Sequence, residues 1–122
     1  MKQVLIGDDE EEVRTALARE LELMQFEVDL ARNPQEVIAK ARTNIYSAVV
    51  TDLEYTVDGR EGYQVLKEIK DVCAVKILYT GLSGFEHVLE GFEHGADHVV
   101  LGKNQLTLVE ILNSIKRGEK NE

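Results

Sequence analysis

Acidic and hydroxyl side chains stand at the ends of several strand-like segments of this sequence. Asp8 and Asp9 come directly after the first segment, the third segment ends at Asp52, and the fourth ends at Thr80. In an open parallel α/β sheet, ligands bind just beyond the carboxyl ends of the strands. These four residues are therefore the first candidates for chemistry.

The chemistry open to these residues depends on which strands are neighbours. Right-handed crossovers and a strand order of 2-1-3-4-5 would place Asp8, Asp9 and Asp52 together. Ionised carboxylates in one crevice repel one another and raise one another's pKa unless a cation compensates for their charge. Magnesium is a suitable cation because it prefers oxygen ligands such as carboxylates. An aspartate held beside the ion can attack a phosphoryl group and form an acyl phosphate. Thr80 would then be placed to hydrogen-bond to a phosphoryl oxygen.

A simpler explanation covers part of the acidic run from Asp8 to Glu12. Acidic side chains at a helix N-terminus are favoured by the helix dipole without any ligand, and this accounts for 10–12. Asp8 and Asp9 directly follow a buried strand, so the functional reading is favoured for them. Asp52 alone would fit an ordinary turn equally well, and its expected partners make it a site residue.

Short β-branched runs alternate with longer amphipathic stretches, which indicates βα units around a parallel sheet. Apolar triplets in three of these runs are typical of strands covered on both faces. We therefore predict an α/β fold, a flavodoxin-like three-layer sandwich of five helices around a five-stranded parallel sheet of order 2-1-3-4-5. The predicted strands are Gln3–Ile6, Glu27–Ala31, Ala48–Asp52, Val75–Thr80 and His98–Leu101.

Apolar residues at three- and four-residue steps mark the predicted helices. The first spans 11–24 and carries Val13, Ala16, Leu17, Leu21 and Met24 on one face. The second continues through Val37, Ile38 and Ala41, the third carries Tyr63, Leu66 and Ile69, and the fourth carries Phe85, Val88, Leu89 and Phe92.

Several helix boundaries have their own sequence signals. Asn33 is predicted to be an N-cap with Pro34 at the first helical position, and Gly95 a left-handed stop for the fourth helix. The fifth helix is predicted to span Thr107–Lys116, with Thr107 and Glu110 forming a capping box.

Length and charge restrict the class of protein. The chain has 122 residues, the size of one domain, and we predict one domain over 1–122 with a frayed tail at 118–122. A formal charge of −9 disfavours direct binding to nucleic acid or anionic lipid. The sequence shows no apolar stretch long enough for a membrane span or a signal peptide, which predicts a cytoplasmic protein. The single cysteine, Cys73, is expected in the core.

Four segments in this order and spacing resemble the receiver domain of two-component response regulators, and the stand-alone chemotaxis receiver in particular. They look like the opening strand with its acidic pair, the strand of the phosphorylated aspartate, the strand of the switch hydroxyl, and the entry to the fifth strand. In this sequence they are Val4–Glu10, Ala48–Asp52, Ile77–Gly81 and Gly95–His98.

The resemblance implies a signalling switch in which Asp52 accepts a phosphoryl group from a histidine kinase or phosphotransfer protein. It also implies a Mg²⁺ site in which Asp9 binds directly and Asp8 largely through water, completed by Asp52 and the backbone carbonyl of Glu54. Thr80 would be the switch hydroxyl. A downstream effector would contact the face of the fourth helix, fifth strand and fifth helix. No enzyme activity is implied beyond self-catalysed phosphotransfer and dephosphorylation.

The sequence departs from the family pattern at the lysine of the site. Strict spacing from Gly95 places Gly102 at the family's lysine position, and Lys103 comes one residue later. Because glycine tolerates unusual dihedral angles, we predict a bulge at Gly102 that turns Lys103 back into the crevice. In the alternative, Lys103 is a solvated loop residue and the site works without a lysine.

Two further departures concern the switch itself. The loop from Leu53 to Gly62 lacks the family's proline and is slightly longer, and the aromatic residue often found on strand five is replaced by Val99 or Val100. These departures leave open a pseudo-receiver, which binds partners constitutively without phosphotransfer. A flavodoxin-like enzyme or nucleotide binder is a weaker alternative, because no loop has the glycine and hydroxyl density to cradle a cofactor phosphate. The three histidines, His87, His94 and His98, are expected at the surface rather than in a metal cluster.

Overall fold

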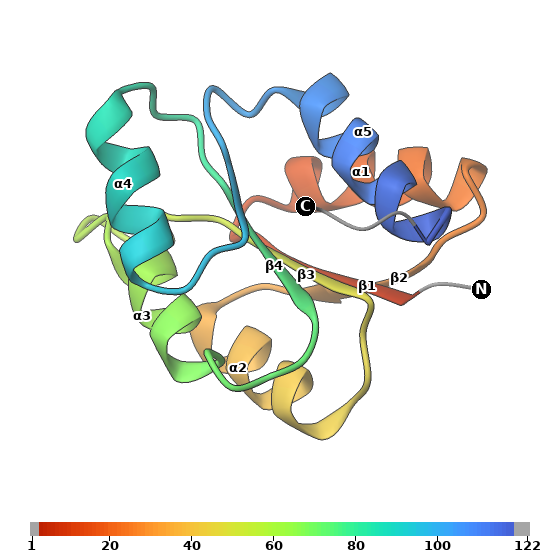
Figure 1. Ribbon diagram of the computed structural model, residues 1–122, viewed down its shortest axis with the longest axis horizontal. Coiled ribbons are helices and arrows are strands. Elements are labelled where there is room, and N and C mark those ends of the chain that lie inside the picture. The colour runs from red at the N-terminus through yellow and green to blue at the C-terminus, as the bar shows by residue number, and fades with distance from the viewer. Residues whose placement is uncertain (1–2, 119–122) are drawn as a thin grey trace.

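The computed structural model describes residues 3–118, which form a five-stranded parallel sheet of order β2-β1-β3-β4-β5. Figure 1 shows α1 and α5 covering one face of this sheet, with α2, α3 and α4 on the other. The strands are β1 Gln3–Gly7, β2 Glu27–Ala31, β3 Ala48–Thr51, β4 Val75–Tyr79 and β5 His98–Val100. The helices are α1 Glu11–Leu23, α2 Pro34–Thr43, α3 Glu61–Glu68, α4 Phe85–Glu93 and α5 Gln105–Lys116. The predicted fold class and strand order are confirmed.

The strand register places the predicted site residues at one edge of the sheet. Gly7, the last residue of β1, lies opposite Thr51, the last residue of β3. The backbone N–H of Asp52 donates to the carbonyl of Gly7 at 2.9 Å. The residues that follow these two strands therefore leave the sheet side by side.

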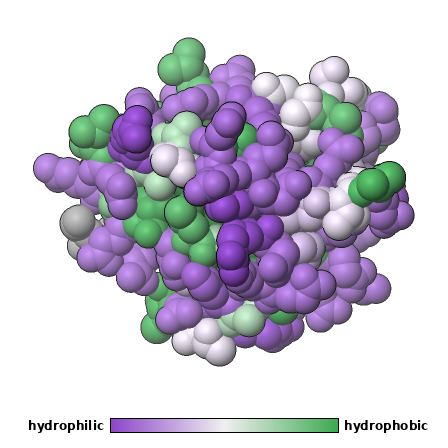
Figure 2. Space-filling model, turned by 180° about the vertical axis from the view of Figure 1, so that it is seen from behind, coloured by the Kyte–Doolittle hydropathy of each residue, from purple (hydrophilic) through white to green (hydrophobic). Residues whose placement is uncertain are grey.

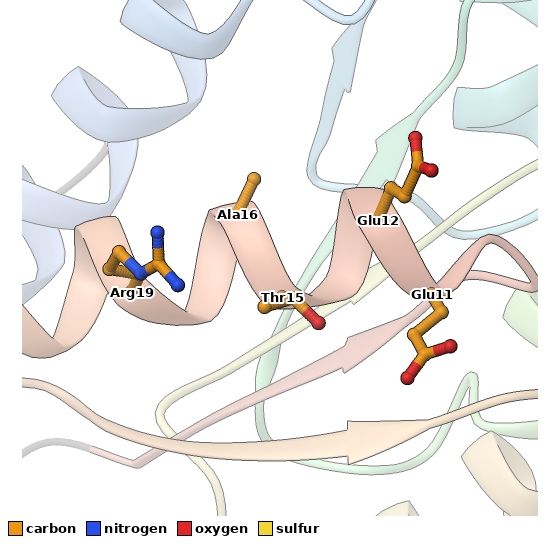
Figure 3. Close-up of a pocket in the computed structure, with 5 residues that line it drawn as sticks. All are labelled: Glu11, Glu12, Thr15, Ala16 and Arg19. Carbon is orange, nitrogen blue, oxygen red and sulfur yellow. The ribbon is translucent and has the colours of Figure 1, made fainter.

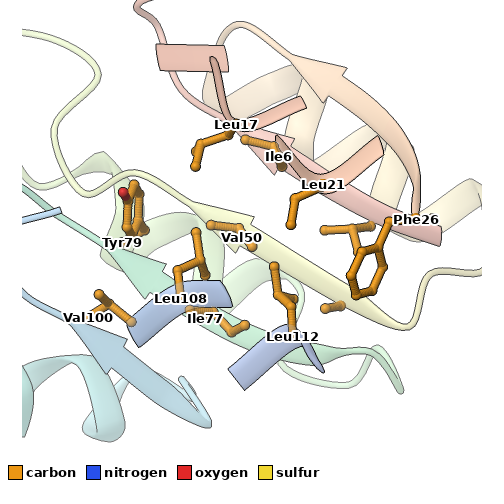
Figure 4. Close-up of a cluster of buried hydrophobic side chains, with 12 residues drawn as sticks. Ile6, Leu17, Leu21, Phe26, Val50, Ile77, Tyr79, Val100, Leu108 and Leu112 are labelled. Carbon is orange, nitrogen blue, oxygen red and sulfur yellow. The ribbon is translucent and has the colours of Figure 1, made fainter. Parts of the chain in front are cut away.

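The apolar triplets of the sequence fill both layers between helices and sheet. Alternate residues of a strand point to opposite faces. On the face shown in Figure 4, Ile6 and Val50 of the sheet pack against both helices of that layer. Their partners are Leu17 and Leu21 of α1 and Leu112 of α5. Leu5 and Val49 point to the other face, where they pack with Val37, Val65 and Ile69. Burial on both faces fixes the sheet between its helices, and through it the edge that carries the site.

The predicted start of α2 and end of α4 are confirmed. The side-chain oxygen of Asn33 accepts the N–H of Glu36 at 2.8 Å, and Pro34 is the first residue of α2. Gly95 follows α4 with a φ of +110°, in the left-handed region that glycine adopts without strain.

The predicted capping box of the fifth helix is wrong. α5 begins two residues earlier, at Gln105, and its N-cap is Asn104, whose side chain accepts the N–H of Thr107 at 3.2 Å. Thr107 is thus the third helical residue rather than the cap. Strand ends also differ from prediction by one residue: β1 extends through Gly7, and β3, β4 and β5 end before Asp52, Thr80 and Leu101.

Two residues expected in the core are exposed. Cys73 lies on the surface before β4. Ala16 lies on α1 and is exposed. It is roughly 100° around the helix axis from the buried Leu17, because an α-helix has 3.6 residues per turn. It lines a shallow groove on the outer side of α1 with Glu11, Glu12, Thr15 and Arg19 (Figure 3). The remainder of the predicted tail, 119–122, lies outside the described residues.

Charged residues dominate the surface. Figure 2 shows a reverse face that is mainly hydrophilic, with the apolar side chains broken into small patches. Among residues 3–118, no helix has the length and apolar character that a membrane span requires.

The corrected start of α5 is testable by stability measurements. Replacing an Asn N-cap with alanine usually costs about 1 kcal/mol, because an N–H of the first turn loses its partner. We expect Asn104→Ala to lower the free energy of unfolding in urea by about this amount. Thr107→Ala, at an exposed helical position, serves as the control and should change it by less than half as much. A larger loss of stability in Thr107→Ala than in Asn104→Ala would show that Thr107 is the N-cap after all.

Candidate functional site

A crevice opens at the carboxyl edge of the sheet, where the sequence predicted a site. Its lining comes from the β1–α1 connection, the loop after β3, the start of the loop after β4, and the turn after β5. The lining residues are Asp9, Glu10, Asp52, Glu54, Gly81 and Lys103. Most of the predicted site residues therefore come together here, from four separate connections of the chain.

Asp52 of the crevice and its neighbour Asp8 form a pair of buried carboxylates bridged by one ammonium group. The Nζ of Lys103 is 2.9 Å from Oδ2 of Asp8 and 3.6 Å from Oδ2 of Asp52. The side chains of the two aspartates are 2% and 5% exposed, and that of Lys103 is 22% exposed. Glu10 lies at the outer side of the same ammonium, at 3.9 Å. Lys103 thus offsets part of the negative charge of the crevice.

The surroundings of Asp52 raise the pKa of its carboxyl group. Burial, followed by the charge of Asp8, raises the pKa of Asp52 to about 7. Lys103 and the backbone N–H groups of Leu53 and Glu54 act in the opposite direction without cancelling the rise in pKa. Burial opposes the charge of Lys103, but the hydrogen bond to Asp8 and the charge of Asp52 raise its pKa overall. The lysine is therefore a permanent cation, whereas Asp52 is only partly ionised near neutral pH.

The acidic run of the β1–α1 connection could hold a cation. Asp8, Asp9 and Glu10 each present a carboxylate oxygen, and these oxygens lie within 4.8 Å of one another. Hard divalent ions such as Mg²⁺ take oxygen ligands of this kind. The donor set fits magnesium, and it includes Glu10, which the sequence analysis assigned to the helix dipole alone. The N–H of Glu10 also donates to Oδ1 of Asp8 at 2.9 Å, which fixes that carboxylate.

Thr80 is fully buried at the end of β4. Its hydroxyl oxygen accepts the N–H of Leu82 at 3.1 Å, and its own N–H donates to the carbonyl of Val100 at 3.0 Å. The next residue, Gly81, lines the crevice. The hydroxyl therefore lies at the start of the loop that leads into α4, and it accepts a hydrogen bond from the backbone of the same loop.

The loop between β3 and α3, which the sequence analysis found unusual, is held by its own side chains. The carboxylate of Glu61 accepts the N–H of Tyr55 at 3.1 Å and the hydroxyl of Thr56. The Tyr55 phenol is buried, and its hydroxyl lies 2.8 Å from Oγ1 of Thr51. Gly62 packs so closely on the backbone of Asp52 that a Cβ there would lie 2.3 Å from the Asp52 carbonyl oxygen. These contacts order the loop without a proline.

Lys103 reaches the crevice through a left-handed turn. Gly102 has a φ of +62° and Lys103 a φ of +44°, and both follow the last residue of β5. The expected bulge is therefore a turn after the strand rather than an irregularity within it. The turn contains the extra residue that places Lys103 one position later than the lysine of the family pattern.

The three histidines form no metal cluster among the described residues. His87 and His94 of the α4 region are partly buried against Tyr63 of α3. The Tyr63 hydroxyl lies 3.3 Å from Nδ1 of His87, and its ring stacks on His94 with centroids 4.9 Å apart. His98 on β5 is also partly buried, and its Nε2 is buried without a hydrogen-bond partner in the described structure. The three histidines are thus partly exposed at the surface, and His87 and His94 also contact Tyr63.

Two tyrosines beside the site were missed by sequence reasoning. Tyr79 precedes Thr80, and its hydroxyl donates to the backbone carbonyl of Lys103 at 2.9 Å; Tyr55 lies under the loop that follows Asp52. Both occur in apolar or loop sequence where a tyrosine is an ordinary core residue. No spacing signal marks the distant groups that their hydroxyls contact.

Comparisons with known proteins agree with this geometry. A sequence model of the family described as the response regulator receiver domain matches residues 4–115. The transcriptional regulatory protein ResD of Bacillus subtilis is 31% identical over 100 residues, which are 81% of this chain and 41% of ResD. The transcriptional regulatory protein SrrA of Staphylococcus aureus is 33% identical over 100 residues, which are 81% of this chain and 41% of SrrA. This chain therefore spans about two fifths of the length of these relatives.

Solved structures show the same fold. The response regulator protein TrrA of Thermotoga maritima, crystallised in complex with Mg²⁺-BeF, is 31% identical and superposes with a TM-score of 0.81, over 94% of this chain and 99% of that one. The receiver domain of a Francisella response regulator superposes with a TM-score of 0.86 at 21% identity, over 98% of this chain and 100% of that one.

The raised pKa of Asp52 predicts a pH-dependent stability penalty. The native pKa of about 7 exceeds the ordinary value of 3.8, so the native state binds more protons than the unfolded state between these values. The contribution of Asp52 is therefore most favourable below pH 4 and is lost as the pH rises through 7. We expect Asp52→Asn, which cannot ionise, to be more stable than the unchanged protein by up to about 4 kcal/mol at pH 8.

Urea unfolding in EDTA at pH 8 and at pH 4 measures this difference. The advantage of Asp52→Asn should shrink to near zero at pH 4, where both side chains are neutral. Asp58→Asn, at an exposed position in the same loop, is the control and should show no such dependence. An advantage of equal size at both pH values would contradict the assigned pKa shift.

Proposed function

This chain belongs to the response regulator receiver domain family, and from that premise we propose that it is a signalling switch phosphorylated on Asp52. The phosphodonor is a histidine kinase or a phosphotransfer protein. The observation that carries the proposal is the placement of Asp52 at the open edge of the sheet. The ammonium of Lys103 lies 3.6 Å from Asp52 and also contacts Asp8, and Asp9 lines the same crevice.

The proposed reaction needs the ionised form of Asp52. A carboxylate oxygen of Asp52 attacks the phosphorus atom of the donor, the bond from phosphorus to the donor nitrogen breaks, and its electron pair stays on that nitrogen. The product is an acyl phosphate on Asp52. The incoming group carries about −1.5 to −2 charges at neutral pH, and Lys103 is close enough to offset part of this by a charge-assisted hydrogen bond.

Asp9 and Asp8, with Asp52 and the backbone carbonyl of Glu54, are the proposed protein ligands of Mg²⁺. The carboxylate cluster of the β1–α1 connection supports this assignment, and Glu54 lines the same crevice as Asp9. The structure of TrrA in complex with Mg²⁺-BeF is a further support. A bound Mg²⁺ would neutralise charge on the carboxylates and on the transferring phosphoryl group.

Thr80 is the proposed switch hydroxyl. Phosphorylation would draw its hydroxyl from the N–H of Leu82 toward a phosphoryl oxygen, which changes the loop that leads into α4. α4 exposes the apolar side chains of Phe85, Leu89 and Phe92, at 71%, 52% and 48%. We assign the docking of a downstream effector to this face, formed by α4, β5 and α5.

The remaining parts of the proposal concern the chain as a whole. It acts as one receiver domain over 1–122 in the cytoplasm, without direct contact to nucleic acid or membrane. It is a phosphoacceptor rather than an enzyme with a separate substrate, apart from self-catalysed transfer and hydrolysis on Asp52.

Phosphorylation by a small phosphodonor tests the proposal. With acetyl phosphate and Mg²⁺, the protein should gain the mass of one phosphoryl group in an intact-mass spectrum. Asp52→Asn should gain none, and the control Asp58→Asn should match the unchanged protein. Equal modification of Asp52→Asn would end the assignment to Asp52. A folded protein that gains no phosphoryl group at all would favour the pseudo-receiver, a constitutive binding module.

A further inference from the structure

The turn that presents Lys103 to the crevice holds a residue in an unfavourable backbone conformation. Lys103 has a φ of +44°, in the left-handed region where a side chain costs roughly 1–2 kcal/mol. Gly102, at +62°, adopts this region without such a cost. A lysine in the left-handed region needs contacts that hold its backbone there, and the backbone conformation sets the direction in which the side chain leaves the chain.

Consecutive residues at the end of β4 hold both backbone polar groups of Lys103. The N–H of Lys103 donates to the carbonyl of Thr80 at 2.7 Å. The hydroxyl of Tyr79 donates to the carbonyl of Lys103 at 2.9 Å. Tyr79 is 4% exposed, and burial raises the pKa of its phenol, so the hydroxyl keeps its proton at neutral pH.

At its other end, Lys103 contacts the proposed phosphoacceptor site. Its ammonium is 2.9 Å from Asp8 and 3.6 Å from Asp52. We propose that Tyr79 is a positioning residue for Lys103, whose hydroxyl holds the left-handed turn and so directs the ammonium to Asp52. This inference rests on the proposed function, since it assigns a role within that site to a residue that does not touch the reacting atoms.

The packing around Tyr79 allows the hydroxyl to act separately from the ring. The ring belongs to the core between the sheet and the α1 and α5 layer (Figure 4). An open surface depression lies beside the ring, lined by Val13, Leu17, Lys103 and Gln105 among others. Replacing Tyr79 with phenylalanine removes the hydrogen bond to the turn and leaves the ring in the core.

A double-mutant cycle tests the coupling. Tyr79→Phe should slow phosphorylation of Asp52 by acetyl phosphate about three- to tenfold, the range expected for losing one hydrogen bond that holds the lysine. Lys103→Ala should slow it at least as much. In the Lys103→Ala background, Tyr79→Phe should have no further effect, because the residue that it positions is gone.

Tyr46→Phe is the matched control. Tyr46 is also a buried tyrosine, and its hydroxyl donates to Asp29 at 2.6 Å, on β2 and away from the crevice. It should lose stability much as Tyr79→Phe does, yet keep the rate of phosphorylation. An unchanged rate in Tyr79→Phe, or effects of Tyr79→Phe and Lys103→Ala that multiply, would overturn the inference.

A second measurement tests the inference if the protein takes no phosphoryl group, which would contradict the proposed function alone. The backbone ¹³C chemical shifts of Lys103, measured by NMR, depend on its φ and ψ and distinguish a left-handed residue from an extended or helical one. In the unchanged protein and in Tyr46→Phe they should be those of a left-handed residue, and in Tyr79→Phe they should move toward averaged values. Identical Lys103 shifts in Tyr79→Phe would show that the hydroxyl does not hold the turn.

Discussion

The repulsion between the buried carboxylates of Asp8 and Asp52 is the constraint on which the rest of this structure depends. The parallel sheet creates it, because β1 and β3 are neighbours and end in register. In the described structure, Lys103 is the cation that bridges the pair, at 2.9 and 3.6 Å. Burial of Asp52, followed by the charge of Asp8, keeps the pKa of Asp52 near 7 in spite of Lys103. The carboxylates of Asp8, Asp9 and Glu10 could hold a second cation beside Lys103.

The surrounding loops keep these charged groups in place at some conformational cost. Lys103 adopts a positive φ and is held by Tyr79, the last residue of β4, and by Thr80, which follows it. The lysine and the proposed switch hydroxyl therefore share one strand end. On the other side of Asp52, Glu61 binds the loop backbone and Gly62 permits close packing. The outer ends of β3, β4 and β5 thus form a single connected frame around the crevice.

Much of this was readable from the sequence. Hydrophobic periodicity predicted the elements and their order, and the position of Asp8 and Asp52 after buried strands predicted their meeting. The errors occurred where a local pattern competes with another nearby. Asn104 precedes Thr107 and takes the cap, and Ala16 falls outside a narrow buried stripe. The roles of Tyr79 and Glu61 were not predictable, because they depend on which backbone groups the folded chain leaves unpaired.

Calorimetric titration with Mg²⁺ at neutral pH tests the central claim, that the carboxylate cluster requires a cation beyond Lys103. The unchanged protein should bind one ion. Asp9→Ala should bind it at least about tenfold more weakly, since the proposed direct carboxylate ligand is lost. Glu11→Ala, which removes an exposed acidic side chain at the start of α1, should bind like the unchanged protein. Equal affinity in all three proteins would contradict the account.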